Sequence, residues 1–256
     1  MSQDRITLVC EGQTRGPDLR WLGLALEKLA ESVELARDVD LVPAGSKANL
    51  SAMVRGMRKS LGTRRVYAVR DRDFLLADLL GKDEPDGVYS LMRHCIESYM
   101  AEPAVLEAVF GSNGMEARLV ALAERRFWPD LCRAVLDALG YELRQRRLHL
   151  EDDVPASKAD VIQIAKLKLD VFRDELAAKP LPVDALVESF ERDMRSAPVW
   201  MRVNGKGLLR SLAGELDAAT LPGGDIEARL FAWCARNGPP APLVLEMRQL
   251  LERLPP

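Results

Sequence analysis

Three short apolar runs in the first part of the chain constrain its fold more than any other feature. They are "ITLVC" (6–10), "VDLVPAG" (39–45) and "RVYAV" (65–69), and the third is apolar on both faces. Apolar residues at helical spacing separate these runs. Doubly buried strands joined by amphipathic helices are typical of a parallel sheet covered on both sides. "GVYSLM" (87–92) is expected to add a fourth strand.

After about residue 100 the strand signal fades and helical patterns replace it. Helices are expected at 162–176 and near 115–140, 183–196, 206–217, 225–236 and 243–254, with Pro and Gly between them. The predicted fold class is therefore α/β, with a mostly parallel sheet flanked by helices and followed by an all-helical C-terminal half. The predicted domains are an α/β unit at 1–105 and a helical unit at 106–256.

Composition limits the chemistry that the chain can use. Its 256 residues are 48% hydrophobic, which is enough for one or two globular domains. Two histidines exclude imidazole-rich metal sites, and four dispersed cysteines without a CxxC pair argue against a disulfide framework. A net charge of −3 excludes a protein that coats nucleic acid over its whole surface. We expect a cytoplasmic protein because no membrane-length apolar run or leader is present.

Acidic residues follow the predicted strands. Glu11 follows the first strand, Asp71 and Asp73 end the third in "VYAVRDRDF", and Glu97 lies shortly after the fourth. The carboxyl ends of parallel strands meet at one edge, where crowded carboxylates repel each other unless a cation lies between them. Hard oxygen ligands suit Mg²⁺ or Mn²⁺, so we expect a divalent metal site. The alternative is that these acids cap helices or lie in solvated turns.

Several motifs in one order resemble a known family. Glu11-Gly12, "PAGSKANL" (43–50), "DRDF" (71–74) and "RHCIESYM" (93–100) resemble the TOPRIM domain of small bacterial proteins related to OLD nucleases. That branch includes effectors of PARIS-type anti-phage systems, which work with an ABC-type ATPase. The resemblance covers residues 6–106 and extends to "NGKGLLRSL" (204–212). It implies a TOPRIM-like sheet and metal-dependent cleavage of DNA or RNA, tRNA included.

The resemblance also implies roles for individual residues. Glu11 corresponds to a metal ligand or general base, Asp71 and Asp73 to metal ligands, and Glu97 to a further acid and ligand. The family's acid-Ile-Glu-Asn-Tyr pattern stands here as Cys-Ile-Glu-Ser-Tyr at 95–99, without the first acid and the Asn. The expected partners are nucleic acid and an ABC-type ATPase, with a homodimer as a further option and no membrane. No GxxxxGK[ST] sequence occurs, so ATP hydrolysis by that route is not expected of this chain.

Phosphate contacts are expected from Gly45, Ser46 and Lys47 at one helix start and from Arg72 in "DRDF". Lys206, at a second helix start, is expected to be a catalytic residue that approaches a backbone phosphate or the leaving oxygen. Free backbone amides at a helix start can hold a phosphate, although an ordinary cap or turn would use the same residue types. The basic runs "RGMRKSLGTRR" (55–65) and "RQRR" (144–147) either line a nucleic-acid groove or are solvated helix faces.

The leading hypothesis is therefore a Mg²⁺- or Mn²⁺-dependent nuclease whose helical half contacts a partner or substrate. The competing hypothesis is a catalytically inactive TOPRIM or receiver-like module that binds a partner, because receivers also place acids after their first and third strands. A receiver ends soon after its fifth strand, whereas this chain continues into a long helical half. Glycosyltransferases and haloacid-dehalogenase-type phosphatases place their DxD motif in a different order.

Overall fold

A four-stranded, all-parallel sheet is the centre of the N-terminal part. The computed structural model describes residues 5–14, 16–31, 38–45, 49–76, 81–143, 155–170, 181–216 and 225–255. The strands are β1 (Ile6–Cys10), β2 (Val39–Pro43), β3 (Val66–Arg70) and β4 (Val88–Ser90), in the order β2-β1-β3-β4. All four predicted strands and the α/β class are confirmed.

Successive side chains of the central strands are buried on opposite faces of the sheet, as the period of two in a strand requires. Val9 and Ala68 pack in one apolar cluster, whereas Leu8 and Val69 belong to a second cluster on the other face. Because both faces are apolar, each needs its own cover of helices. This is the physical reason for the three-layer arrangement.

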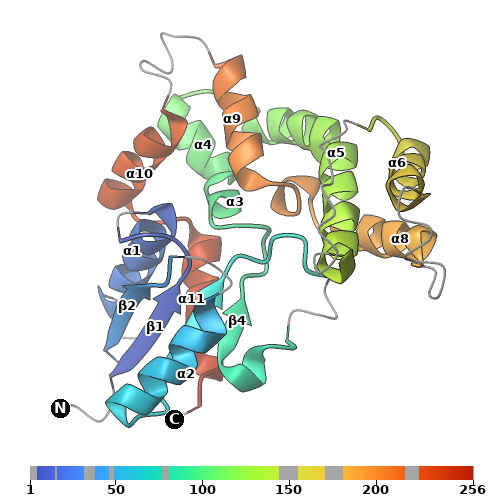
Figure 1. Cartoon of the computed structure of the whole chain (residues 1–256). Coiled ribbons are helices and arrows are strands. Elements are labelled where there is room, and N and C mark those ends of the chain that lie inside the picture. Colours follow the sequence, from blue (N-terminus) through green and yellow to red (C-terminus); the bar gives the residue numbers. More distant parts are fainter. Residues whose placement is uncertain are drawn as a thin grey trace.

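Helices cover the two faces of the sheet from different parts of the chain (Figure 1). α2 (Leu50–Leu61) covers one face through Leu50 and Val54. α1 (Pro17–Glu31) packs beside α11 (Ala241–Arg253) on the opposite side. The Tyr67 hydroxyl of β3 donates a hydrogen bond to the Pro255 carbonyl at 3.2 Å, which ties the C-terminal end to the sheet.

The remaining helices of the described residues belong, with α11, to the helical half. They are α3 (Glu97–Met100), α4 (Pro103–Phe110), α5 (Met115–Leu143), α6 (Lys158–Asp170), α8 (Val183–Met194), α9 (Gly205–Glu215) and α10 (Ile226–Asn237), with short 3₁₀ turns η3 (Glu84–Asp86) and η5 (Val199–Met201). The predicted helices are confirmed within the described residues, and the part of the 162–176 helix beyond residue 170 lies outside them. α3 and α4 were not predicted. Within the described ranges, no helix is both long and apolar enough to cross a bilayer.

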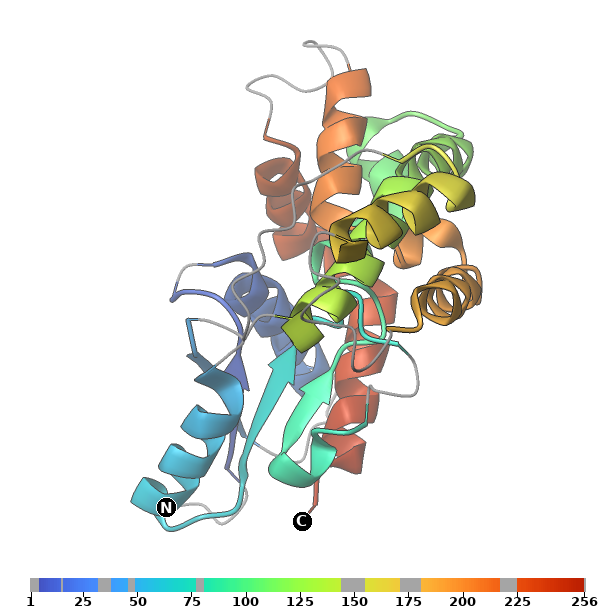
Figure 2. The same ribbon diagram turned by 45° about the vertical axis from the view of Figure 1, so that its right-hand side comes forward.

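The buried core runs without interruption from the sheet into the helical half. One apolar cluster includes Leu8 of β1, Leu131 of α5, Leu209 of α9 and Met247 of α11. The boundary predicted at residues 105–106 therefore does not divide the core. Figure 2 shows α11 running alongside the sheet while α5, α8 and α9 lie beyond its carboxyl edge.

We predict that α11 contributes to the stability of the whole chain. Met247→Ala removes a fully buried side chain and should lower the free energy of unfolding by about 2–5 kcal/mol. Leu245→Ala, on the same helix but half-exposed, should change it by less than about 0.5 kcal/mol. Urea unfolding of both variants measures the difference. Equal effects would mean that α11 is not part of the common core.

Candidate metal and phosphate site

The order of the strands defines the edge of the sheet at which a ligand is expected to bind, and we call this edge with its acids the acid crevice. The chain passes from β1 to β2 on one side and later enters β3 on the other side of β1. In open α/β sheets, ligands bind outside the carboxyl ends of the strands at such a switch point. Glu11 directly follows β1 and Asp71 directly follows β3, so both predicted site residues lie at this edge.

The loop after β1 brings a further carboxylate to the crevice. Gly12 has a φ of 87°, and its carbonyl accepts a hydrogen bond from the amide of Gly45 at 2.9 Å. A Cβ on Gly12 would lie 2.7 Å from Oδ2 of Asp18, in the first turn of α1, so a side chain at this position would displace the carboxylate. Sequence reasoning missed Asp18, because an acid at a helix start is ordinarily explained by the helix dipole.

The Asp-Arg-Asp segment after β3 is fixed by backbone contacts. Asp73 has a φ of 49°, which is rare for a residue other than glycine. Its amide donates a hydrogen bond to the His94 carbonyl at 2.6 Å. Asp71 is buried, and its Oδ1 accepts a hydrogen bond from the Ile96 amide at 3.0 Å. Both contacts join the end of β3 to the segment that precedes Glu97.

Arg72 lies between these two acids but has a different role from the one predicted. Its side chain is only 2% exposed and forms an ion pair with Asp193 of α8. It also donates hydrogen bonds to the carbonyls of Leu75 at 2.9 Å and Met92 at 3.2 Å. A substrate phosphate cannot reach a guanidinium that is enclosed in this way. Arg72 therefore anchors the loop to the helical half and is not a phosphate contact.

Glu97 is the most deeply buried acid of the site. It begins α3, is 0% exposed, and neither of its carboxylate oxygens accepts a hydrogen bond within the described residues. The ammonium of Lys206, in the first turn of α9, lies 3.4 Å from Oε1. The Lys206 side chain is 52% exposed, so one side of the ammonium faces solvent. The structure thus brings together two predicted site residues from distant parts of the chain.

Gly205 explains how α9 reaches Glu97. A Cβ on Gly205 would lie 2.5 Å from the Ser98 amide nitrogen of α3, which is backbone and cannot easily shift. Asn204 caps the helix by accepting a hydrogen bond from the Gly207 amide at 2.9 Å. The Asn-Gly-Lys-Gly sequence is therefore a close-packed helix start and not a plain turn.

The charges of the crevice act on one another. Burial raises the pKa of Asp71 well above its usual range, and the carboxylates of Asp18, Glu97 and Glu11 raise it further. Burial, then Glu97, raises the pKa of Asp18 to about 6. Partial burial lowers the pKa of Lys206, but the neighbouring acids, Glu97 first, outweigh this and raise it overall. Perturbed groups of this kind concentrate at functional sites.

The donor set suits a hard divalent cation, but its geometry is not that of a formed metal centre. Carboxylate oxygens are the ligands that Mg²⁺ prefers, and buried Glu97 offers two oxygens that accept no hydrogen bond from a described residue. Among the residues that the structure describes, no three His, Cys, Asp or Glu side chains converge on one ion position. The cation that does lie against these acids is Lys206.

Three predicted phosphate contacts are only partly described. Ser46 and Lys47 lie outside the described residues, as does the basic run at 144–147. Gly45 has a φ of 79°, and its amide already donates to the Gly12 carbonyl. That amide is therefore not available to a phosphate in this arrangement.

No family model, curated protein or solved structure matches this chain. The resemblance to TOPRIM proteins therefore rests on the quoted motifs alone. The geometry of the crevice is the independent ground for assigning a function.

The raised pKa of Asp18 predicts how stability depends on pH. The folded pKa of Asp18 lies above its unfolded value, so its charged carboxylate destabilises the fold above about pH 6. Protonation removes this destabilisation as the pH falls through about 6. Asp18→Asn should therefore raise the melting temperature at pH 8 more than at pH 5, by about 2–4 °C per kcal/mol recovered. Thermal denaturation in EDTA tests this, with exposed Asp38→Asn as the control. A gain that is equal at both pH values would contradict the expectation.

The ion pair between Lys206 and Glu97 predicts a second stability effect. Lys206→Met keeps the apolar stem but leaves the buried carboxylate without its cation, which should cost about 1–3 kcal/mol. Adding Glu97→Gln should recover most of that loss. Lys158→Met is a matched control, because Lys158 also begins a helix and pairs with the more exposed Glu191 at 3.0 Å. Similar losses at both lysines would show that the Glu97 contact has no special weight.

Proposed function

We propose that this protein is a metal-dependent nuclease that cleaves phosphodiester bonds. The observation that carries the proposal is the fully buried Glu97, which faces Lys206 at 3.4 Å within a crevice of acids at the sheet's switch point. Carboxylates crowded at such an edge weaken the fold, as the raised pKa values of Asp18 and Asp71 indicate. Such an arrangement is typical of a site that binds a cation and a phosphate.

The acids differ in the role that each would play. Asp71, Asp73 and Glu97 would hold Mg²⁺ or Mn²⁺, which supplies charge stabilisation to the phosphate and a lower pKa to the attacking water. Glu11 is half-buried directly after β1 and is the group proposed to accept the proton. Asp73 is also half-buried, and its backbone has a φ of 49°.

Lys206 would contact the substrate. Because the surrounding carboxylates raise its pKa, it stays protonated at neutral pH. About half of its side chain is exposed, so the ammonium can donate to a phosphate oxygen or to the leaving oxygen. Lys206 would therefore serve both as a substrate contact and as the ion-pair partner of Glu97.

The resemblance to PARIS-type effectors extends the proposal to a biological setting. We propose a bacterial anti-phage effector that acts in the cytoplasm on DNA or RNA, tRNA included, together with an ABC-type ATPase. The helical half would supply the partner surface. Val120 of α5 and Leu167 of α6 are large apolar residues exposed there, at 40% and 56%.

One observation favours a second candidate, a catalytically inactive module that binds a partner. Lys206 already neutralises Glu97, and no three acids converge within the described residues. In such a module, the ammonium would replace the metal permanently. The two candidates differ in whether Mg²⁺ or Mn²⁺ stabilises the protein.

Asp73→Asn separates the two candidates most sharply. Asn has the same shape and tolerates a positive φ, so the fold should survive. The lost charge should abolish cleavage and remove the rise in melting temperature that saturating Mg²⁺ or Mn²⁺ gives the wild type. Without metal, the variant should be at least as stable as the wild type, because one of the crowded acids is neutral.

The measurements are a thermal-shift series with and without each metal, and a cleavage assay on duplex DNA, duplex RNA and tRNA. Asp38→Asn, at an exposed position away from the crevice, is the control and should behave as the wild type. If Asp73→Asn cleaves nucleic acid at the wild-type rate, Asp73 is not a metal ligand and the proposed nuclease site is wrong. A wild type that neither gains stability from metal nor cuts any substrate would favour the inactive module.

A further inference from the structure

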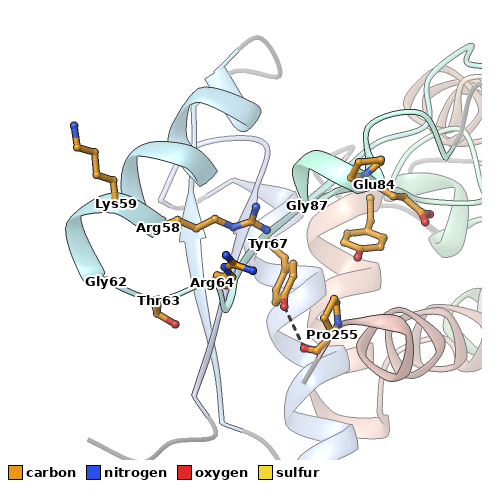
Figure 3. A pocket seen from close by; sticks show the side chains of 11 residues that line it. Arg58, Lys59, Gly62, Thr63, Arg64, Tyr67, Glu84, Gly87 and Pro255 are labelled. Atoms are coloured by element: carbon orange, nitrogen blue, oxygen red, sulfur yellow. Dashed lines mark hydrogen bonds between the residues drawn. The ribbon is translucent and has the colours of Figure 1, made fainter.

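A hollow lies at the amino edge of the sheet, where β3 begins (Figure 3). It has a volume of about 830 Å³ and lies between the end of α2, the start of β3, η3 and the C-terminal end. In Figure 3 the guanidinium groups of Arg58 and Arg64 lie near each other beside Tyr67, whose hydroxyl contacts Pro255. We call this hollow the basic pocket.

The acid that lines the basic pocket is neutralised by its own partner. Glu84 forms an ion pair with Arg253 at 3.4 Å. Nearby Asp86 lies 4.0 Å from the guanidinium of Arg55, on the exposed side of α2. These carboxylates therefore do not compensate the cations that line the pocket.

Three cations line the pocket, and their charges are available to a ligand. Lys59 and Arg64 are exposed, and neither forms an ion pair with a described residue. Arg58 is held in place because its Nε donates to the Val66 carbonyl at 2.9 Å, and a carbonyl carries no net charge that would neutralise a guanidinium. The pocket thus combines one fixed guanidinium with two exposed cations, on a chain whose net charge is −3. Such a local concentration of positive charge attracts anions.

The aromatic rings of the pocket cannot recognise a base. Tyr67 and Tyr89 are 3% and 5% exposed and pack edge to face, with centroids 6.3 Å apart. The guanidinium of Arg58 lies over one ring at 5.5 Å, and that of Arg253 lies over the other at 5.8 Å. Base recognition by stacking needs an open ring face. The chemistry therefore favours backbone phosphates over a free nucleotide.

We propose that the basic pocket is a second contact for the phosphate backbone of a double-helical nucleic acid, and this inference rests on the proposed nuclease function. α2 begins at Leu50, seven residues after β2 ends at the carboxyl edge of the sheet, and Arg58 and Lys59 near its other end line the pocket. Its 12 residues span about 18 Å, which is about five base pairs of duplex. A duplex lying along α2 would place one phosphate at the crevice and others at Lys59 and Arg64.

Equilibrium binding without metal tests the pocket apart from catalysis. Labelled duplex DNA and duplex RNA are titrated in EDTA over a series of salt concentrations. The binding constant K falls as salt rises. Lys59→Gln and Arg64→Gln should each make the slope of log K against log salt less steep by about 1, and the double variant by about 2, because each cation neutralises about one phosphate. Arg118→Gln, at an exposed arginine on α5, is the matched control and should keep the wild-type slope. Melting temperatures confirm that the variants fold.

The outcomes separate this inference from the proposed function. A double variant with the wild-type slope, or a wild type that binds neither duplex, overturns the pocket. Weaker duplex binding by the double variant supports the basic pocket even if the wild type cuts no substrate. The absence of cleavage would then count only against the proposed nuclease function. ATP is a third ligand in the test. The inference would also be overturned if ATP bound tightly and its binding depended on Arg64, while duplex binding did not depend on Arg64.

Discussion

Electrostatic repulsion among the acids at the β1 and β3 edge is the constraint on which the rest of the structure depends. Glu97 is buried without a hydrogen bond from any described residue, and Asp71 is held near it through the Ile96 amide. Such a cluster persists only if a positive charge reaches it. The chain supplies one from α9, where Gly205 permits the approach of Lys206. The helical half therefore supplies, through Lys206, the positive charge that the acids at the sheet edge need.

The loops of the crevice are held from the outside by the helical half. Arg72 joins the end of β3 to α8, and Glu246 of α11 accepts hydrogen bonds from the Met92 amide and the Tyr99 hydroxyl. These contacts fix the backbone on either side of the acids. The positions of the acids therefore depend on residues that lie outside the crevice, as in other sites built on rigid surroundings.

The sheet and the crevice edge could be predicted from the sequence because strand burial and strand ends are local signals. Glu11, Asp71 and Asp73 were placed at the edge by this reasoning, and the strand order agrees. Asp18 could not be found, since its approach depends on the conformation of Gly12. Arg72 was wrongly predicted to contact phosphate, because the sequence does not show which side chains after a strand are buried by the tertiary fold. α4 was not predicted, because its eight residues are too few to show a clear helical periodicity.

The position of α11 in the chain has a consequence for biosynthesis. β1 to β4 emerge from the ribosome long before the helix that packs beside α1 on their second face. Until residues 241–253 are made, part of the apolar face that holds Leu8 and Val69 has no permanent cover, and Lys206 arrives only shortly earlier. Long-range closure of this kind slows folding and leaves apolar surface exposed meanwhile. A partly synthesised chain would therefore carry the crowded acids of the crevice without the ammonium of Lys206, and would need a chaperone more than a finished chain does.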